Sequence, residues 1–201
     1  MAQEPEKDTR TPDYAEELWR GQRTWWKRLV PVQLPYRLNL RAQRLGRTLD
    51  IGCGTGRNLR SLPAGSVGVD HNPRLVGIAR SQGLEAVTTE EFADESNRST
   101  QFDSLLFSHV LEHMTLDEAA GLLKQYLPHL NQGGRVFVIC PQERGFRRDR
   151  THVHFMTDDD IRRLLQEAGV RVERSYSFPF PRAAGRYFTY NEFCVRGRLA
   201  G

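Results

Sequence analysis

The sequence has little lysine and cysteine, and it lacks a long apolar run. Only three of its 29 Lys and Arg residues are lysine. No apolar stretch approaches the roughly 18 residues that a membrane-spanning helix needs, and the acidic Met1–Glu6 segment does not resemble a secretory signal. The three cysteines form no Cys-x-x-Cys pair, which argues against a disulfide framework and a structural zinc site. We therefore expect no membrane insertion and a cytoplasmic protein.

The 201 residues are enough for one domain with an extension. An apolar share of 38% and a charged share of 27% exclude wholesale disorder. The net charge of +4 is mild, and nucleic-acid binding usually needs a more concentrated basic patch. Residues 1–13 are polar and predict a disordered tail, whereas residues 14–46 contain all three tryptophans and predict a helical cap.

From residue 47 to residue 201, strand-like and helix-like segments alternate. The expected strands are 47–51, 66–69, 85–87, 102–107, 135–139, 170–175 and 192–195. Helix starts are marked by Asn72-Pro73 and by capping boxes at Thr115–Glu118 and Thr157–Asp160, with helices expected over 119–130 and 161–168. This alternation predicts an α/β domain with a mainly parallel sheet covered on both faces.

A glycine-rich loop follows the first of these strands, in Leu49-Asp50-Ile51-Gly52-Cys53-Gly54-Thr55-Gly56-Arg57-Asn58. Glycines let the backbone approach a ligand closely, and we expect a helix after them. Asp50 is placed to face an ammonium group, and Asp70, at the end of the next strand, to accept hydrogen bonds from ribose hydroxyls. A dinucleotide-binding loop would need its third glycine at position 57, which is Arg57, so a nicotinamide oxidoreductase is disfavoured.

Residues 47–140 resemble class I S-adenosylmethionine-dependent methyltransferases of the small-molecule branch. The resemblance rests on the glycine loop, Asp70, the stretch Phe102–His113, and the glycine turn in Leu127–Arg135. It implies a Rossmann-like, doubly wound, seven-stranded and mostly parallel sheet whose last strand is antiparallel. It also implies S-adenosylmethionine as cofactor and S-adenosylhomocysteine as product.

The same resemblance assigns the cofactor contacts. The loop contacts the methionine end, the acid after the second strand binds the ribose, the segment after the third strand contacts adenine, and the turn after the fourth strand completes the pocket. In that order the residues are Asp50, Gly52, Cys53, Gly54, Gly56 and Asn58; Asp70 and His71; Glu91 and Phe92; Ser108, His109 and His113.

A general base would serve a hydroxyl or amine acceptor. His154 is the first candidate and His152 the second, because both follow the fifth strand on the substrate side, and Glu143 lies at the same rim. His113 is expected chiefly to cap or pack a turn. His109 is expected to line the cofactor pocket without taking part in the chemistry.

Two other chemistries involve residues of this rim. His152-Val153-His154 with Asp158–Asp160 could suggest a metal, but Asp160 is better explained as a helix-cap partner of Thr157, so no metal is expected. Cys140 stands where some RNA cytosine-C5 methyltransferases place a nucleophile. No surrounding motif supports that role, and a free cysteine is most often buried packing.

The predicted acceptor is a small molecule with an apolar body and an anionic end. Arg144, Arg147 and Arg148 could bind the anion, while Trp25 and the aromatic segment 178–190 could form a lid. The alternatives are an RNA or protein methyltransferase and a non-catalytic cofactor-binding protein. Nucleic-acid enzymes that methylate amino groups carry an Asn/Asp-Pro-Pro-Tyr motif, which Ser108–Leu111 lacks. The sequence leaves the oligomeric state open.

Overall fold

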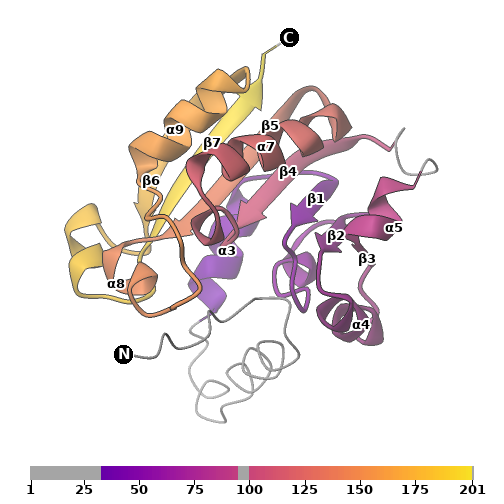
Figure 1. The fold of residues 1–201 in the computed structure, drawn as a ribbon, viewed down its shortest axis with the longest axis horizontal. Helices are drawn as coiled ribbons and strands as arrows, with labels where there is room; N and C mark the ends of the chain where they lie inside the picture. Colours follow the sequence, from indigo (N-terminus) through magenta and orange to yellow (C-terminus); the bar gives the residue numbers. More distant parts are fainter. Residues whose placement is uncertain (1–32, 95–99, 201) are drawn as a thin grey trace, which may run out of the picture.

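A computed structural model of the protein describes residues 33–94 and 100–200. Its centre is a seven-stranded sheet in the order β3-β2-β1-β4-β5-β7-β6 (Figure 1). The strands are β1 (Thr48–Ile51), β2 (Val67–Asp70), β3 (Ala86–Thr88), β4 (Phe102–Ser108), β5 (Leu130–Pro141), β6 (Val170–Phe178) and β7 (Glu192–Leu199). All seven predicted strands are present, and the last three extend beyond their predicted bounds.

Neighbouring strands from β3 to β5 are parallel, and β7 is antiparallel to both β5 and β6. The chain therefore returns to place its last strand, reversed, between two earlier ones. This arrangement confirms the Rossmann-like, doubly wound sheet with an antiparallel last strand. Parallel strands deliver their carboxyl ends to one edge of the sheet, where such folds bind ligands.

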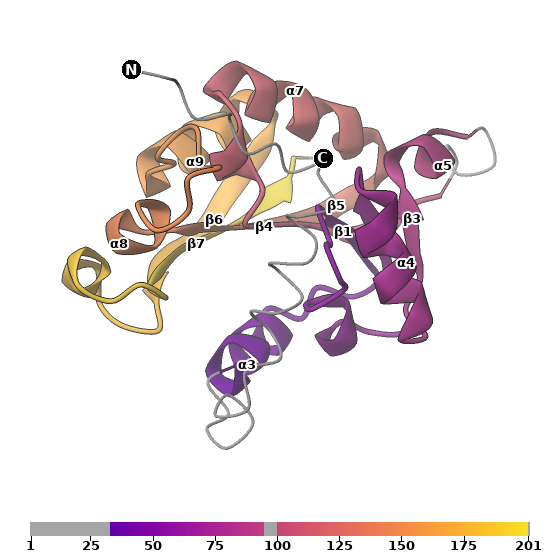
Figure 2. The same ribbon diagram turned by 60° about the horizontal axis from the view of Figure 1, so that its bottom comes forward.

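Helices lie over both faces of the sheet (Figure 2). They are α3 (Leu34–Ala42), α4 (Pro73–Ser81), α5 (Thr89–Ala93), α7 (Leu116–Tyr126), α8 (Glu143–Phe146) and α9 (Asp158–Glu167). Short 3-10 helices are η1 (Leu59–Ser61), η2 (Leu111–His113), η3 (Leu127–His129) and η4 (Arg182–Arg186). The prediction of helices on both faces is confirmed.

The core follows the two-residue period of the strands. In β4, Leu105 and Phe107 pack in a large cluster with residues of α7 and α9. Leu106, between them, joins a second cluster on the other face with Leu40 of α3 and Phe137 of β5. Each apolar strand thus serves two cores at once, which explains its near-continuous apolar sequence.

The predicted helix starts are confirmed in detail. Asn72 accepts a hydrogen bond from the Arg74 backbone, and Thr115 and Thr157 each form a reciprocal capping box. Other expectations were wrong. The glycine loop leads only into the three-residue η1 instead of a regular helix, because Leu59 and Ser61 turn into the core there.

Two further boundaries differ from those expected for the segment 119–135. Helix α7 ends at Tyr126, and Pro128 falls in η3, because proline has no N–H to continue the helical ladder. Gly133 and Gly134 lie inside β5 and not in a turn before it. The pairing of β4 with β5 passes from Phe102↔Leu130 to Ser104↔Arg135, so residues 131–134 form a bulge.

The expected tail, residues 1–13, and most of the expected cap, residues 14–46, lie outside the described residues, and α3 is the part of the cap that is described. The domain boundaries stay predictions. Within residues 33–94 and 100–200, no helix has the length and apolar character that crossing a bilayer requires.

Candidate functional site

The glycine loop folds back onto the end of β2. The backbone N–H groups of Gly52 and Cys53 donate to the Val69 carbonyl at 2.8 and 3.1 Å. Gly52 and Gly54 have positive φ angles of 69° and 55°, which favour glycine. A Cβ on Gly52 would collide with Val110, whereas a Cβ on Gly54 would meet no atom within 4 Å. The loop is therefore packed against the turn after β4 on one side and open at its crest.

Asp50 lies beneath this loop with an unpartnered carboxyl group. It is 1% exposed, and neither carboxylate oxygen has a hydrogen-bond partner in the described part of the chain. Burial raises its pKa to about 8, although the charge of Arg57 partly opposes that rise. A buried carboxylate without a partner is costly. This group therefore fits a cationic ligand bound at the loop.

Asp70 ends β2 and connects the loop to the start of α4. One carboxylate oxygen accepts from the Gly54 backbone at 2.8 Å, and the other accepts from the Asn72 backbone at 2.9 Å. Each oxygen retains a second lone pair for a hydroxyl donor. His71 is exposed beside it, with Nδ1 3.7 Å from the Asp70 carboxylate. The structure thus brings Asp50, Asp70 and His71 to one edge of the sheet.

Glu91 and Phe92, the adenine contacts expected after β3, have partners within the protein. Glu91 accepts from the Thr88 backbone at 2.8 Å and pairs with the Arg80 guanidinium. Phe92 is buried in the core, with its ring centroid 4.8 Å from that of His129. Phe92 is thus packed in the core, and its contact with adenine stays a prediction.

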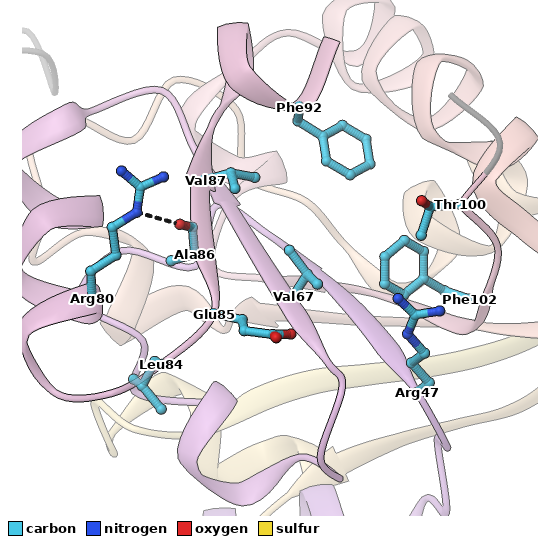
Figure 3. Close-up of a pocket in the computed structure, with 10 residues that line it drawn as sticks. All are labelled: Arg47, Val67, Arg80, Leu84, Glu85, Ala86, Val87, Phe92, Thr100 and Phe102. Atoms are coloured by element: carbon cyan, nitrogen blue, oxygen red, sulfur yellow. Dashed lines mark hydrogen bonds between the residues drawn. The ribbon is translucent and has the colours of Figure 1, made fainter. Parts of the chain in front are cut away.

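Phe92 also lines a cavity of about 440 Å³ at the amino-terminal ends of the strands (Figure 3). This cavity lies among the first residues of three strands, which are Val67 of β2, Ala86 of β3 and Phe102 of β4. Ligands of doubly wound sheets bind at the opposite, carboxyl ends. The cavity is thus separate from the site built around Asp50.

The turn after β4 is organised by His109, which has an unusual φ of 58°. Its Nδ1 lies 3.2 Å from Glu112 Oε1, and its Nε2 lies 2.9 Å from Glu192 Oε1. Both carboxylates are acceptors when ionised, so both ring nitrogens must donate and the ring is an imidazolium. Burial alone would lower its pKa, but the two carboxylates raise it to about 9.

Sequence reasoning missed Glu112 and Glu192 as site residues. Glu112 is fully buried, and although burial opposes its ionisation, the hydrogen bond from His109 lowers its pKa. The three-residue spacing from His109 to Glu112 was a usable signal, since one helical turn brings such pairs together. Glu192 lies 83 positions from His109, and only the return of β7 beside β5 brings it there.

His113 and His152 face each other across the rim, with ring centroids 4.8 Å apart. His113 Nδ1 lies 3.2 Å from the Thr151 carbonyl, and burial lowers the pKa of His113. His152 Nδ1 lies 2.7 Å from the Phe146 carbonyl, and its ring stacks on that of Phe146. His113 thus ends η2 and packs against the 151–152 segment, as expected from the sequence.

The other two base candidates are paired with charged groups. His154 Nε2 is buried without a hydrogen-bond partner in the described residues and lies 4.0 Å from Asp160 Oδ2. Glu143 accepts a two-pronged interaction from the Arg182 guanidinium. That interaction lowers the pKa of Glu143, which makes it a weak base.

The remaining candidates lie at the edge of the site or outside it. Arg144, Arg147 and Arg148 are exposed on and just after α8. Ser108 is buried at the end of β4 and Asn58 is half-buried at the end of the loop, whereas Trp25 lies outside the described residues. Cys140 is fully buried, and burial raises its pKa well above the usual value, which supports the expectation that it is packing. Cys53 is buried as well.

A family model described as a methyltransferase domain matches residues 18–175. Among curated proteins, the chain is 30% identical over 122 residues to the ubiquinone biosynthesis O-methyltransferase of Xanthomonas oryzae pv. oryzae, covering 55% of this chain and 49% of that protein. The Xylella fastidiosa protein of the same name is also 30% identical, over 120 residues, covering 55% of this chain and 48% of its own. The chain thus spans about half the length of these relatives.

Solved structures share the fold at low identity. Magnesium protoporphyrin IX methyltransferase from Synechocystis PCC 6803, crystallised with SAH, has a TM-score of 0.66 at 16% identity and covers 96% of each chain. N-methyltransferase NodS from Bradyrhizobium japonicum WM9 in complex with S-adenosylhomocysteine has a TM-score of 0.66 at 17% identity, covering 93% of this chain and 98% of its own. The matches confirm the resemblance inferred from residues 47–140.

Proposed function

The chain belongs to the methyltransferase domain family, and from that premise we propose that it transfers a methyl group from S-adenosylmethionine to a small-molecule acceptor. The observation that carries the cofactor proposal is Asp50, a buried carboxylate beneath an open glycine loop with no hydrogen-bond partner in residues 33–94 and 100–200. A second carboxylate, Asp70, stands one strand away with lone pairs available.

The residues at this edge fit the chemical groups of S-adenosylmethionine. Asp50 would hold the ammonium of the methionine end, since neither of its carboxylate oxygens has a hydrogen-bond partner among the described residues. The backbone around Gly54 would lie against the ligand, because no side chain covers it. Asp70, with His71 beside it, would accept hydrogen bonds from the ribose hydroxyls. The other proposed contacts are Gly52, Cys53, Gly56, Asn58, Ser108, His109, His113 and Glu91.

When bound, S-adenosylmethionine supplies an electrophilic methyl group, so the protein chiefly positions the acceptor and removes its proton. We retain His154 as the first candidate base. Its Nε2 lies 4.0 Å from Asp160 Oδ2, and with the proton on Nε2 its Nδ1 would carry the lone pair that accepts the proton of the acceptor. His152 ranks second, and because its Nδ1 is held by the Phe146 carbonyl, its Nε2 would be the basic nitrogen. Glu143 ranks last because of its lowered pKa.

The acceptor is proposed to have an apolar body and an anionic end. Exposed Arg144, Arg147 and Arg148 support the anionic end, because guanidinium groups pair with carboxylates and phosphates. The half-exposed aromatic rings of Phe180, Phe188 and Tyr190, which contact one another near η4, support the apolar body. The relatives' names include a quinone-pathway and a porphyrin methyltransferase, both with small-molecule acceptors.

Calorimetric titration tests the cofactor proposal directly. We expect S-adenosylmethionine and S-adenosylhomocysteine to bind with micromolar affinity and NADH not to bind. Asp70→Ala should weaken binding at least tenfold, whereas Asp117→Ala, which removes an exposed acid of α7, should not change it. A folded protein that binds neither adenosyl ligand, or that binds NADH instead, would overturn the proposal.

A further inference from the structure

Three side chains of metal-ligating types meet at the turn after β4, and they include one proposed cofactor contact, His113, and one candidate base, His152. They are Glu112, His113 and His152, and one ligand atom from each lies within 4.8 Å of the other two. The sequence had suggested a different set, His152 and His154 with Asp158–Asp160. The fold replaces that set, because Asp160 is engaged by the Thr157 cap.

Backbone hydrogen bonds hold the two segments together. The N–H groups of Val153 and His154 both donate to the Glu112 carbonyl, at 2.8 and 3.2 Å. These bonds fasten the 151–154 segment to η2, which carries Glu112 and His113. His152 is therefore fixed beside them by main-chain contacts, and its position does not depend on the three side chains attracting one another.

The hydrogen bonds of the two imidazoles fix which nitrogen can bind a cation. His152 Nδ1 faces the Phe146 carbonyl at 2.7 Å, and a carbonyl only accepts, so this nitrogen carries the proton. His113 Nδ1 faces the Thr151 carbonyl at 3.2 Å and also the Thr151 hydroxyl oxygen, whose own proton goes to Asp149. When either ring is neutral, Nε2 is then the nitrogen with the lone pair.

The carboxylate of Glu112 completes the set. Its Oε1 accepts from His109, whereas its Oε2 is buried and has no partner in the described residues. One ligand atom from each of the two imidazoles and from this carboxylate thus lies within 4.8 Å of the other two, with the Cys140 thiol as a further neighbour of Glu112. Histidines whose other nitrogen donates to a backbone carbonyl are the usual arrangement around bound zinc.

We propose that Glu112, His113 and His152 form a binding site for a divalent transition-metal cation of the zinc type. Two imidazole nitrogens and one carboxylate oxygen suit zinc or cobalt better than magnesium, which prefers oxygen ligands throughout. Three protein ligands leave a fourth position for water or an oxygen of another ligand. Ligand atoms around a tetrahedral zinc lie about 3.3 Å from one another. Small side-chain movements would bring the three ligand atoms to that separation.

The test uses the full, untagged chain after treatment with a chelator, and it needs no methyl donor or acceptor. Zinc is titrated by calorimetry, and cobalt(II) is titrated by its visible absorption, which intensifies in tetrahedral coordination. The wild type should bind one zinc with micromolar or tighter affinity and show the cobalt spectrum. Magnesium should compete weakly.

Matched histidine variants locate the site. His152→Ala and His113→Ala should each weaken zinc binding at least tenfold and abolish the cobalt spectrum, whereas His154→Ala and His71→Ala should bind as the wild type does. Circular dichroism verifies that each variant is folded. The proposal fails if folded wild type binds no zinc, or if His152→Ala and His154→Ala bind it equally. Because zinc is titrated without a methyl donor and Asp70→Ala tests cofactor binding, failure of the metal site and failure of the cofactor proposal are distinguishable.

Discussion

The buried carboxyl group of Asp50 predicts that cofactor binding releases a proton. In the unliganded protein burial raises its pKa to about 8, so the group is protonated at pH 6.5. Pairing with an ammonium requires the ionised form. One proton must therefore leave for each ligand bound, and the association constant should rise tenfold per pH unit from about pH 6 to about pH 8.

The magnitude of this dependence follows from the pKa. Two pH units below about 8 correspond to a hundredfold change in affinity, or about 2.7 kcal/mol at 1.36 kcal/mol per unit. Above about pH 8 the affinity should fall again, because an α-amino group loses its proton at a pKa of roughly 7.7–8.0. The affinity of S-adenosylmethionine should accordingly pass through a maximum near the pKa of Asp50.

Calorimetry in two buffers with different ionisation enthalpies measures the released proton at pH 6.5. Asp50→Asn keeps the shape but cannot titrate, so its affinity should be at least tenfold weaker at pH 8 and nearly independent of pH. Asp117→Asn should behave as the wild type. Any contribution of His71 to the pH dependence of binding is the same in the wild type, Asp50→Asn and Asp117→Asn. Equal pH slopes in wild type and Asp50→Asn would refute this account.

Asp50 also predicts that the unliganded protein becomes less stable as pH rises, whereas cofactor binding becomes stronger up to about pH 8. Its folded pKa of about 8 exceeds the ordinary value of 3.8, so the folded state binds more protons than the unfolded state between these limits. The free energy of unfolding should then fall by up to about 1.4 kcal/mol per unit as pH rises through this window. Asp50→Asn should remove that loss and be the more stable protein at pH 8, as denaturant unfolding would measure.

Three further changes have defined outcomes. Gly52→Ala forces a Cβ against Val110 at positive φ, so it should cost about 1–3 kcal/mol in denaturant unfolding and weaken cofactor binding; an unchanged midpoint would contradict the described packing. Thr157→Ala removes the capping box of α9 and should cost about 1 kcal/mol, whereas a cost near zero would mean that the cap is dispensable. Arg147→Ala and Arg148→Ala should raise the Michaelis constant of an anionic acceptor without changing cofactor affinity, and unchanged constants would exclude the anion site.

Features whose cause is local could be predicted from the sequence. The caps at Asn72, Thr115 and Thr157 depend on a side chain and a backbone N–H two or three residues away, and all three are present. The strands β4 and β5 were visible because each packs against both cores, which requires a dense apolar sequence. Asp50 and Asp70 could be placed together because parallel strands bring their carboxyl ends to one edge.

Features that depend on packing between distant segments could not be predicted from the sequence. The short η1 follows the glycine loop because Leu59 turns into a core shared with α4, and no local signal specifies that contact. The bulge at 131–134 depends on how β5 pairs with β4. Glu192 reaches His109 only because β7 inserts beside β5, so neither the spacing nor the composition of the sequence indicates their contact.

The histidines at the rim of the site share one residue type but have different hydrogen-bond partners, and those partners assign their chemistry. Both ring nitrogens of His109 face carboxylates, which raise its pKa to about 9 and favour the imidazolium, a form that is neither a base nor a ligand. His113 and His152 each donate from Nδ1 to a backbone carbonyl, which leaves Nε2 available to a cation. His154 alone has its Nε2 near a single carboxylate, at 4.0 Å from Asp160. These partners support the proposals that His154 is the first candidate base and that His113 and His152 are ligands of a cation beside it.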